Sequence, residues 1–143
     1  MPYTFSLEDE PSAGDVAAVN DGLSAYNAQF APWDRAGRVV ILLRDEAGVL
    51  AGGLLGHAFW GWLSVEILWL AEPARGQDYG SRMLALAEQD GIRRGCHHAL
   101  VDTMSFQALP FYQKHAYTIW GQLDDFPLGH QRYFLKKALG APE

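Results

Sequence analysis

Residues 62–103 carry the arrangement that most restricts the fold of this chain of 143 residues. The apolar run Trp62–Leu70 predicts a strand, and Ala71–Ser81 is a glycine-containing loop that opens a helix ending at Arg93-Arg94-Gly95. His98–Thr103 predicts a second, buried strand. Strand, helix and strand make a β-α-β unit with parallel strands. The glycine loop therefore joins a strand to the N-terminus of a helix.

Further elements are predicted before this unit. Alternating side chains in Tyr3–Leu7 are typical of a half-buried strand. A helix then runs from the N-cap Ser12 to about Gln29, in one or two pieces. Arg38–Arg44 and Val49–Ala58 are apolar runs joined by a short turn, which predicts an antiparallel hairpin.

The segment after the unit adds one helix and two strands. Ser105 is a candidate cap for a short helix over 107–115, and Ala116–Leu123 and Arg132–Lys136 are the strand candidates. We therefore expect an α+β fold in which residues 1–143 form a single domain. Its mixed sheet has six or seven strands, several of them antiparallel, and is accompanied by about four helices.

Composition narrows the classes of function. Lys and Arg number 11 against 17 Asp and Glu, and the net charge of −6 disfavours nucleic acid as a partner. The N-terminus lacks a basic and apolar leader, and no run is apolar enough for a membrane span, so we expect a cytoplasmic protein. Cys96-His97-His98 lacks the spaced partners of a zinc site, so no metal is expected.

The glycine loop is the first candidate for chemistry. Free backbone N–H groups at the positive end of a helix dipole are typical of a phosphate site. Arg75 can add a charge-assisted contact, and Ser81 can cap the helix or donate to an anion. The spacing is neither GxxxxGK[ST] nor GxGxxG, which disfavours a nucleoside triphosphate or NAD. From these residues alone, an anion site and an ordinary tight turn stay equally open.

Three segments together resemble the GNAT family of N-acetyltransferases. Arg75–Leu84 is similar to the form Arg-Gly-x-Gly-x-Gly-Ser-x-Leu-Leu of the family signature, and Ser105–Tyr117 contains a segment similar to Phe-Tyr-x-Lys-x-Gly-Phe/Tyr. The tail Asp124–Lys137 resembles bacterial members that end in Pro-x-Gly-His and a Phe-Leu-x-Lys strand. The resemblance covers nearly the whole chain and implies a splayed, mostly antiparallel sheet that acetyl-CoA completes.

The resemblance also implies roles for individual residues. Amides from Gln77 to Ser81 would cradle the pyrophosphate of coenzyme A, and the main chain near Leu70 and Ala71 would pair with the pantetheine arm. The expected cofactor residues are Leu70, Ala71, Arg75, Gly76, Gln77, Asp78, Tyr79, Gly80 and Ser81. Tyr112 resembles the family's tyrosine that protonates the leaving thiolate, which makes it the expected general acid.

The acceptor implied by the resemblance is a primary amine of a small molecule or peptide, and the acidic charge favours a cationic one. Glu66, a lone carboxylate in an apolar strand, is the candidate general base, which burial would tune and a water would assist. A structural carboxylate is the alternative. His57 and His130 are candidate substrate-binding residues and alternative bases, set against ordinary positions in a sheet and a turn.

One position departs from the signature, because Asp78 stands where the family has Gly. Its carboxylate would lie near the pyrophosphate, so a second hypothesis is a catalytically impaired ligand sensor or interaction module. A third is a dimeric structural protein that exposes Trp60, Trp62 and Trp69. A homodimer is also open to the enzyme, and the sequence leaves the identity of the acceptor open.

Overall fold

The computed structural model describes residues 2–140 and divides the chain into two units, one up to Trp33 and one from Asp34. The first unit contains helix α1 (Ala13–Ala28). Ser12 caps it as predicted, because its side chain accepts a hydrogen bond of 3.1 Å from the amide of Asp15. The helix is a single piece that includes Gly22, since a glycine in a helix interior costs only about 1 kcal/mol.

The strand predicted for Tyr3–Leu7 is wrong, because this segment has no regular structure. A strand is stable only when a neighbour accepts and donates its backbone hydrogen bonds. Within residues 2–140 the segment pairs with no strand, and the side chains of Phe5 and Leu7 are fully exposed. The alternating side chains thus indicated an extended segment, but they do not determine whether another strand pairs with it.

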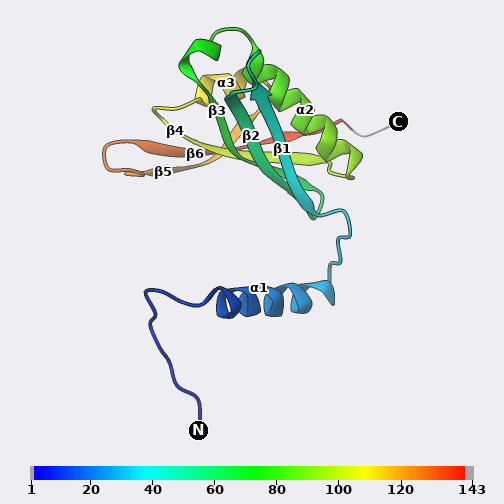
Figure 1. Ribbon diagram of the computed structural model, residues 1–143, viewed down its shortest axis with the longest axis vertical. Coiled ribbons are helices and arrows are strands. Elements are labelled where there is room, and N and C mark those ends of the chain that lie inside the picture. Colours follow the sequence, from blue (N-terminus) through cyan, green and yellow to red (C-terminus); the bar gives the residue numbers. More distant parts are fainter. Residues whose placement is uncertain (1, 141–143) are drawn as a thin grey trace. The chain divides into compact units, whose positions relative to one another are not determined.

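The second unit is built on a six-stranded sheet with the order β1-β2-β3-β4-β6-β5 (Figure 1). Its strands are β1 (Gly37–Arg44), β2 (Leu50–Phe59), β3 (Trp62–Leu70), β4 (His98–Met104), β5 (Thr118–Asp124) and β6 (Gln131–Ala138). β3 and β4 are parallel and every other neighbouring pair is antiparallel. The α+β fold with a mostly antiparallel sheet is confirmed, including the predicted hairpin and the parallel β-α-β pair.

Helices connect the strands of this sheet. They are the 3-10 turn η1 (Glu72–Ala74), α2 (Tyr79–Arg93) and the short α3 (Leu109–Lys114). The described residues therefore contain three α-helices where the sequence predicted about four. Ser105 does not cap α3; its hydroxyl instead accepts a hydrogen bond of 3.2 Å from the amide of Gln131. None of the helices in residues 2–140 is long and apolar enough to cross a membrane.

The core of this unit lies between α2 and one face of the sheet. α2 packs across β1, β2 and β3 (Figure 1), and its buried residues recur at the spacing of one helix face. Gly91 allows this close approach, because a Cβ there would lie 3.3 Å from the Cβ of Leu63. In β4, Ala99, Val101 and Thr103 are buried on the same side, so Asp102 lies on the opposite face.

The sheet opens between β3 and β4. Their parallel ladder runs only from Trp62↔His98 to Val65↔Val101, although both strands continue beyond it. At the same level β3 bulges against β2, since Leu55 pairs with Ile67 and Gly56 with Val65, which leaves Glu66 unpaired. A bulge bends its strand and increases the local twist, so β3 turns away from β4.

Candidate active site

A cleft of about 500 Å³ lies where β3 and β4 separate. Both strands, the start of the loop that follows β3 and the segment that leads into α3 supply its walls. The lining residues are Glu66, Ile67, Leu68, Trp69, Leu70, Arg75, Asp102, Thr103, Phe106, Gln107, Ala108 and Tyr112. Four predicted site residues are thus brought together here: Glu66, Leu70, Arg75 and Tyr112.

Tyr112 is a buried side chain of this cleft, with 4% of its surface exposed. Its ring packs edge-on against Phe111 and Tyr117, at centroid distances of 5.2 and 5.7 Å. Burial, with the negative charge of Asp102 as a smaller cause, raises the pKa of Tyr112 to about 12. The hydroxyl therefore keeps its proton at neutral pH and is available as an acid.

A partly buried polar network holds the ring of Tyr117 beside Tyr112. The Tyr117 hydroxyl donates a hydrogen bond of 2.7 Å to Glu88 on α2. Lys137 on β6 donates to both oxygens of the same carboxylate, at 2.9 and 3.1 Å. Burial and the contact with Glu88 raise the pKa of Tyr117 well above its ordinary value. This network ties α2 to β6 and fixes one wall of the Tyr112 site.

The glycine loop borders a second hollow of about 460 Å³. Leu70, Gly76–Ser81, Phe111 and Lys114 line it. Within residues 2–140, the backbone amides of Gly76–Ser81 have no acceptor; hydrogen bonds end at Arg75 N and resume at Arg82 N. These free donors lie at the N-terminus of α2, a helix of 15 residues, and Lys114 lines the same hollow. Such a set fits an anionic pyrophosphate.

Backbone conformation explains why this loop favours glycine. Gly76 and Asp78 both have positive φ angles, of 76° and 69°. Asp adopts this left-handed region more readily than most residues do, so the loop forms with Asp78 in place of glycine. The Asp78 side chain is exposed and does not cap the helix. Ser81 does not cap it either, because its hydroxyl lies 2.7 Å from Nε2 of His115 at the end of α3.

Leu70 joins the two hollows, because it borders both. The amide of Ala71 donates a hydrogen bond of 2.8 Å to Ala51 O and therefore points toward β2. Since successive residues of a strand point their amides to opposite edges, the main chain of Leu70 faces the cleft. Its carbonyl accepts a hydrogen bond of 3.0 Å from Nε of Arg75, which anchors this side chain at the cleft. Gln77 bonds to Pro73 O at 3.0 Å.

Glu66 lies exposed at the bulge, so the burial that the sequence suggested for it is absent. It borders the cleft and also a hollow of about 480 Å³ on the sheet face, which His57 helps to line. His130 lies behind the cleft wall: its ring is 4.9 Å from that of Phe106, and Nδ1 is 3.4 Å from the Ser105 hydroxyl. Neither histidine lines the cleft itself.

Sequence reasoning missed Asp102, which lies in the cleft wall and pairs with Arg132 at 2.9 Å. A signal was present, because Asp102 is a carboxylate in an apolar strand just as Glu66 is. Its place in the cleft wall beside Arg132 follows from the pairing of β4 with β3 and β6, which the sequence pattern does not specify.

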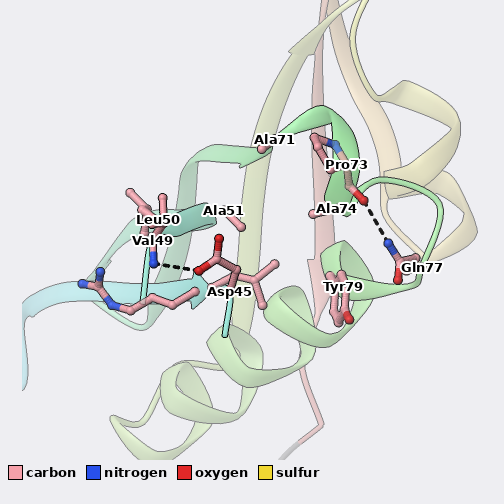
Figure 2. A pocket seen from close by; sticks show the side chains of 11 residues that line it. Asp45, Val49, Leu50, Ala51, Ala71, Pro73, Ala74, Gln77 and Tyr79 are labelled. Carbon is pink, nitrogen blue, oxygen red and sulfur yellow. Dashed lines mark hydrogen bonds between the residues drawn. The ribbon is translucent and has the colours of Figure 1, made fainter. Parts of the chain in front are cut away.

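Another cavity, of about 370 Å³, lies between the β1–β2 turn and η1 (Figure 2). Its polar side chains serve local turns: Asp45 accepts from the amide of Val49 at 2.9 Å, and Gln77 donates to Pro73. The lining is otherwise mainly apolar and contains neither Tyr112 nor Glu66. Tyr112 and Glu66 line the cleft between β3 and β4 instead.

Comparison with known proteins agrees with this geometry. The profile of the acetyltransferase (GNAT) family matches residues 5–117, which spans parts of both units. An acetyltransferase from Agrobacterium fabrum is 37% identical over 134 residues, 93% of this chain and 97% of that protein. Blasticidin-S acetyltransferase from Streptomyces morookaense is 43% identical over 95 residues, 66% of this chain and 70% of that protein. The crystal structure of an acetyltransferase from Bacillus cereus has a TM-score of 0.82 at 28% identity, covering 94% of this chain and 98% of that one.

Proposed function

The chain belongs to the GNAT family of acetyltransferases, which use acetyl-CoA, and we propose that it acetylates a primary amine of a small molecule or peptide. One observation carries the proposal. Leu70 borders both the hollow with free amide donors and the cleft that contains Tyr112. A single ligand can therefore extend from an anion site to a buried acid.

The loop and the edge of β3 fit the two ends of coenzyme A. The amides of Gly76–Ser81 and the amine of Lys114 would hold the pyrophosphate, and the main chain of Leu70 would pair with the pantetheine amides. When bound, acetyl-CoA supplies an acetyl group activated as a thioester. Arg75, already bonded to the Leu70 carbonyl, would keep this edge of the strand in position.

Tyr112 and Glu66 would carry the protons. Glu66, through a water, would take one proton from the ammonium of the acceptor, and the neutral amine would attack the acetyl carbonyl carbon. As the C–N bond forms and the C–S bond breaks, the Tyr112 hydroxyl would give its proton to the departing sulfur. Tyr112 would then recover a proton from the acetylated nitrogen, so the net release would be one proton, which would leave from Glu66 to solvent.

The two histidines would act at the edges of this site. His57 shares a hollow with Glu66 and could pass the released proton onward. His130 would help to shape the acceptor side of the cleft through its contact with Phe106.

For the acceptor, the relative named blasticidin-S acetyltransferase makes a small molecule the first choice. The chain's net charge of −6 favours a cationic one. The competing hypothesis of a sensor impaired by Asp78 gains no support from the loop geometry, because the loop adopts its turn and keeps its amides free with Asp78 exposed.

The test is acetyl transfer itself, followed as thiol release from acetyl-CoA. Blasticidin S, a polyamine and a peptide with a free N-terminus would be compared as acceptors. We expect thiol release to depend on the amine and to match the amount of acetylated product. Binding of acetyl-CoA without transfer to any amine would instead favour the sensor.

A further inference from the structure

A second carboxylate stands beside Glu66 where the strands separate. The last parallel pair is Val65↔Val101, and the next residue on each strand is acidic: Glu66 on β3 and Asp102 on β4. Both line the same cleft. The point where the strands diverge, which we call the apex of the cleft, is thus bounded by one carboxylate on each side.

Asp102 is held so that one oxygen stays available. Arg132 donates to Oδ1 through both Nε and Nη2, at 3.1 and 2.9 Å. The guanidinium of Arg132 is itself fixed between aromatic rings, lying 4.6 Å from the Phe126 centroid and 5.1 Å from that of Phe134. Oδ2 of Asp102 has no partner among the described residues, and 36% of the side chain is exposed.

Charge is separated along the cleft. The cationic Arg75 is bonded to Leu70, four residues along β3 from Glu66, a span of about 13 Å in an extended strand. The end near Arg75 adjoins the loop that would hold the anionic cofactor, and the apex carries the carboxylates. The cleft therefore presents positive charge at the cofactor end and negative charge at the apex.

Between these ends, apolar side chains form part of the cleft wall. Ile67, Trp69 and Phe106 line the cleft and remain about half exposed, at 54%, 50% and 58%. Exposed aromatic and aliphatic walls favour a ligand with an apolar, planar body. Tyr112 lines the same cleft as the two carboxylates.

Resting on the proposed function, we propose that Asp102 is an acceptor-binding residue, whose free oxygen holds the substrate as a primary ammonium carried on a flat apolar body. Arg132 orients Asp102 for this contact, while Glu66 on the facing strand receives the proton. An amine with a carboxylate on the same carbon is disfavoured, because that group would meet the carboxylates of the apex.

Binding to the complex with free CoA separates this role from catalysis. The probes are benzylamine and phenylglycine, which differ by one carboxylate on the carbon that bears the amine. Calorimetric titration should show that the wild type binds benzylamine at least about tenfold more tightly than phenylglycine. Asp102→Asn should weaken benzylamine about tenfold and leave CoA affinity within about twofold. Asp124→Asn, an equal charge change on exposed β5, should alter neither the affinity for benzylamine nor that for CoA.

The outcomes are distinguishable. A wild type that binds CoA but not benzylamine, or an Asp102→Asn variant that binds benzylamine as Asp124→Asn does, overturns the role of Asp102. Equal binding of benzylamine and phenylglycine by the wild type overturns it as well. Failure to bind CoA at all, or to release thiol with any amine, defeats the proposed function instead. Thermal unfolding of each variant excludes a loss of fold as the cause. We expect a midpoint within a few degrees of the wild type, because the Asp102–Arg132 pair is partly exposed.

Discussion

Replacing Tyr112 by Phe removes one oxygen atom from the cleft and keeps the buried ring. The ring retains its edge contacts with Phe111 and Tyr117, at 5.2 and 5.7 Å. The hydroxyl has no hydrogen-bond partner within residues 2–140, so its removal leaves no buried group unsatisfied. We therefore expect Tyr112→Phe to change the free energy of unfolding by less than about 1 kcal/mol.

The effect on turnover is expected to be much larger. A positioned general acid contributes about 10²–10⁴ in rate, so kcat should fall by that factor while the affinity for acetyl-CoA stays within about twofold. Because the pKa of Tyr112 is raised to about 12, the wild-type acid stays protonated well above neutral pH. The wild-type kcat should therefore show no loss from deprotonation of this group below about pH 11.

The assay is steady-state thiol release at several pH values, paired with calorimetric titration of acetyl-CoA into each protein. A variant that turns over at the wild-type rate would refute the acid role. A variant that loses acetyl-CoA affinity in proportion to its rate would show that the hydroxyl serves binding instead. Trp120→Phe offers a control, because this exposed ring lies on β5 and does not line the cleft.

Three other perturbations test the bulge, the glycine loop and the burial of Tyr112. In Gly56→Ala the new Cβ would meet the Ser64 carbonyl oxygen at 2.5 Å, so chemical denaturation should show a loss of about 1–3 kcal/mol in unfolding free energy; an unchanged value contradicts the bulge. Asp78→Gly keeps the positive φ and removes a negative charge, so titration should show equal or tighter acetyl-CoA binding; a marked loss would mean that the carboxylate is used. The folded pKa of Tyr112 lies above its ordinary value of 10.0, so the unfolded chain loses this proton first and stability falls from pH 10 toward pH 12; denaturation curves of Tyr112→Phe should lose about 2 kcal/mol less over this range, and parallel losses would contradict the shift.

Much of the sheet was predictable from the sequence, because strands, hairpins and helix caps depend mainly on residues that are neighbours in the chain. The bounds of β3, the hairpin before it and the Ser12 cap of α1 agree with the sequence. The strand predicted for Tyr3–Leu7 is wrong because a strand requires a partner strand, and alternation within the segment does not specify one.

The environment of the site residues depended on contacts between distant segments. The exposure of Glu66 follows from the bulge opposite Gly56, which only the register of β2 against β3 determines. The pair Asp102–Arg132 forms because β6 lies beside β4, across 30 positions of sequence. The raised pKa of Tyr112 likewise needs the burial that α3 obtains in the folded unit.

In the proposed reaction the loop and the cleft together hold acetyl-CoA for transfer to an amine. We would first titrate the purified protein with acetyl-CoA, and with free CoA, by calorimetry at modest salt. We expect saturable binding of one molecule per chain. Absence of heat at millimolar ligand, together with an unchanged thermal midpoint, would refute cofactor binding by the loop and the cleft.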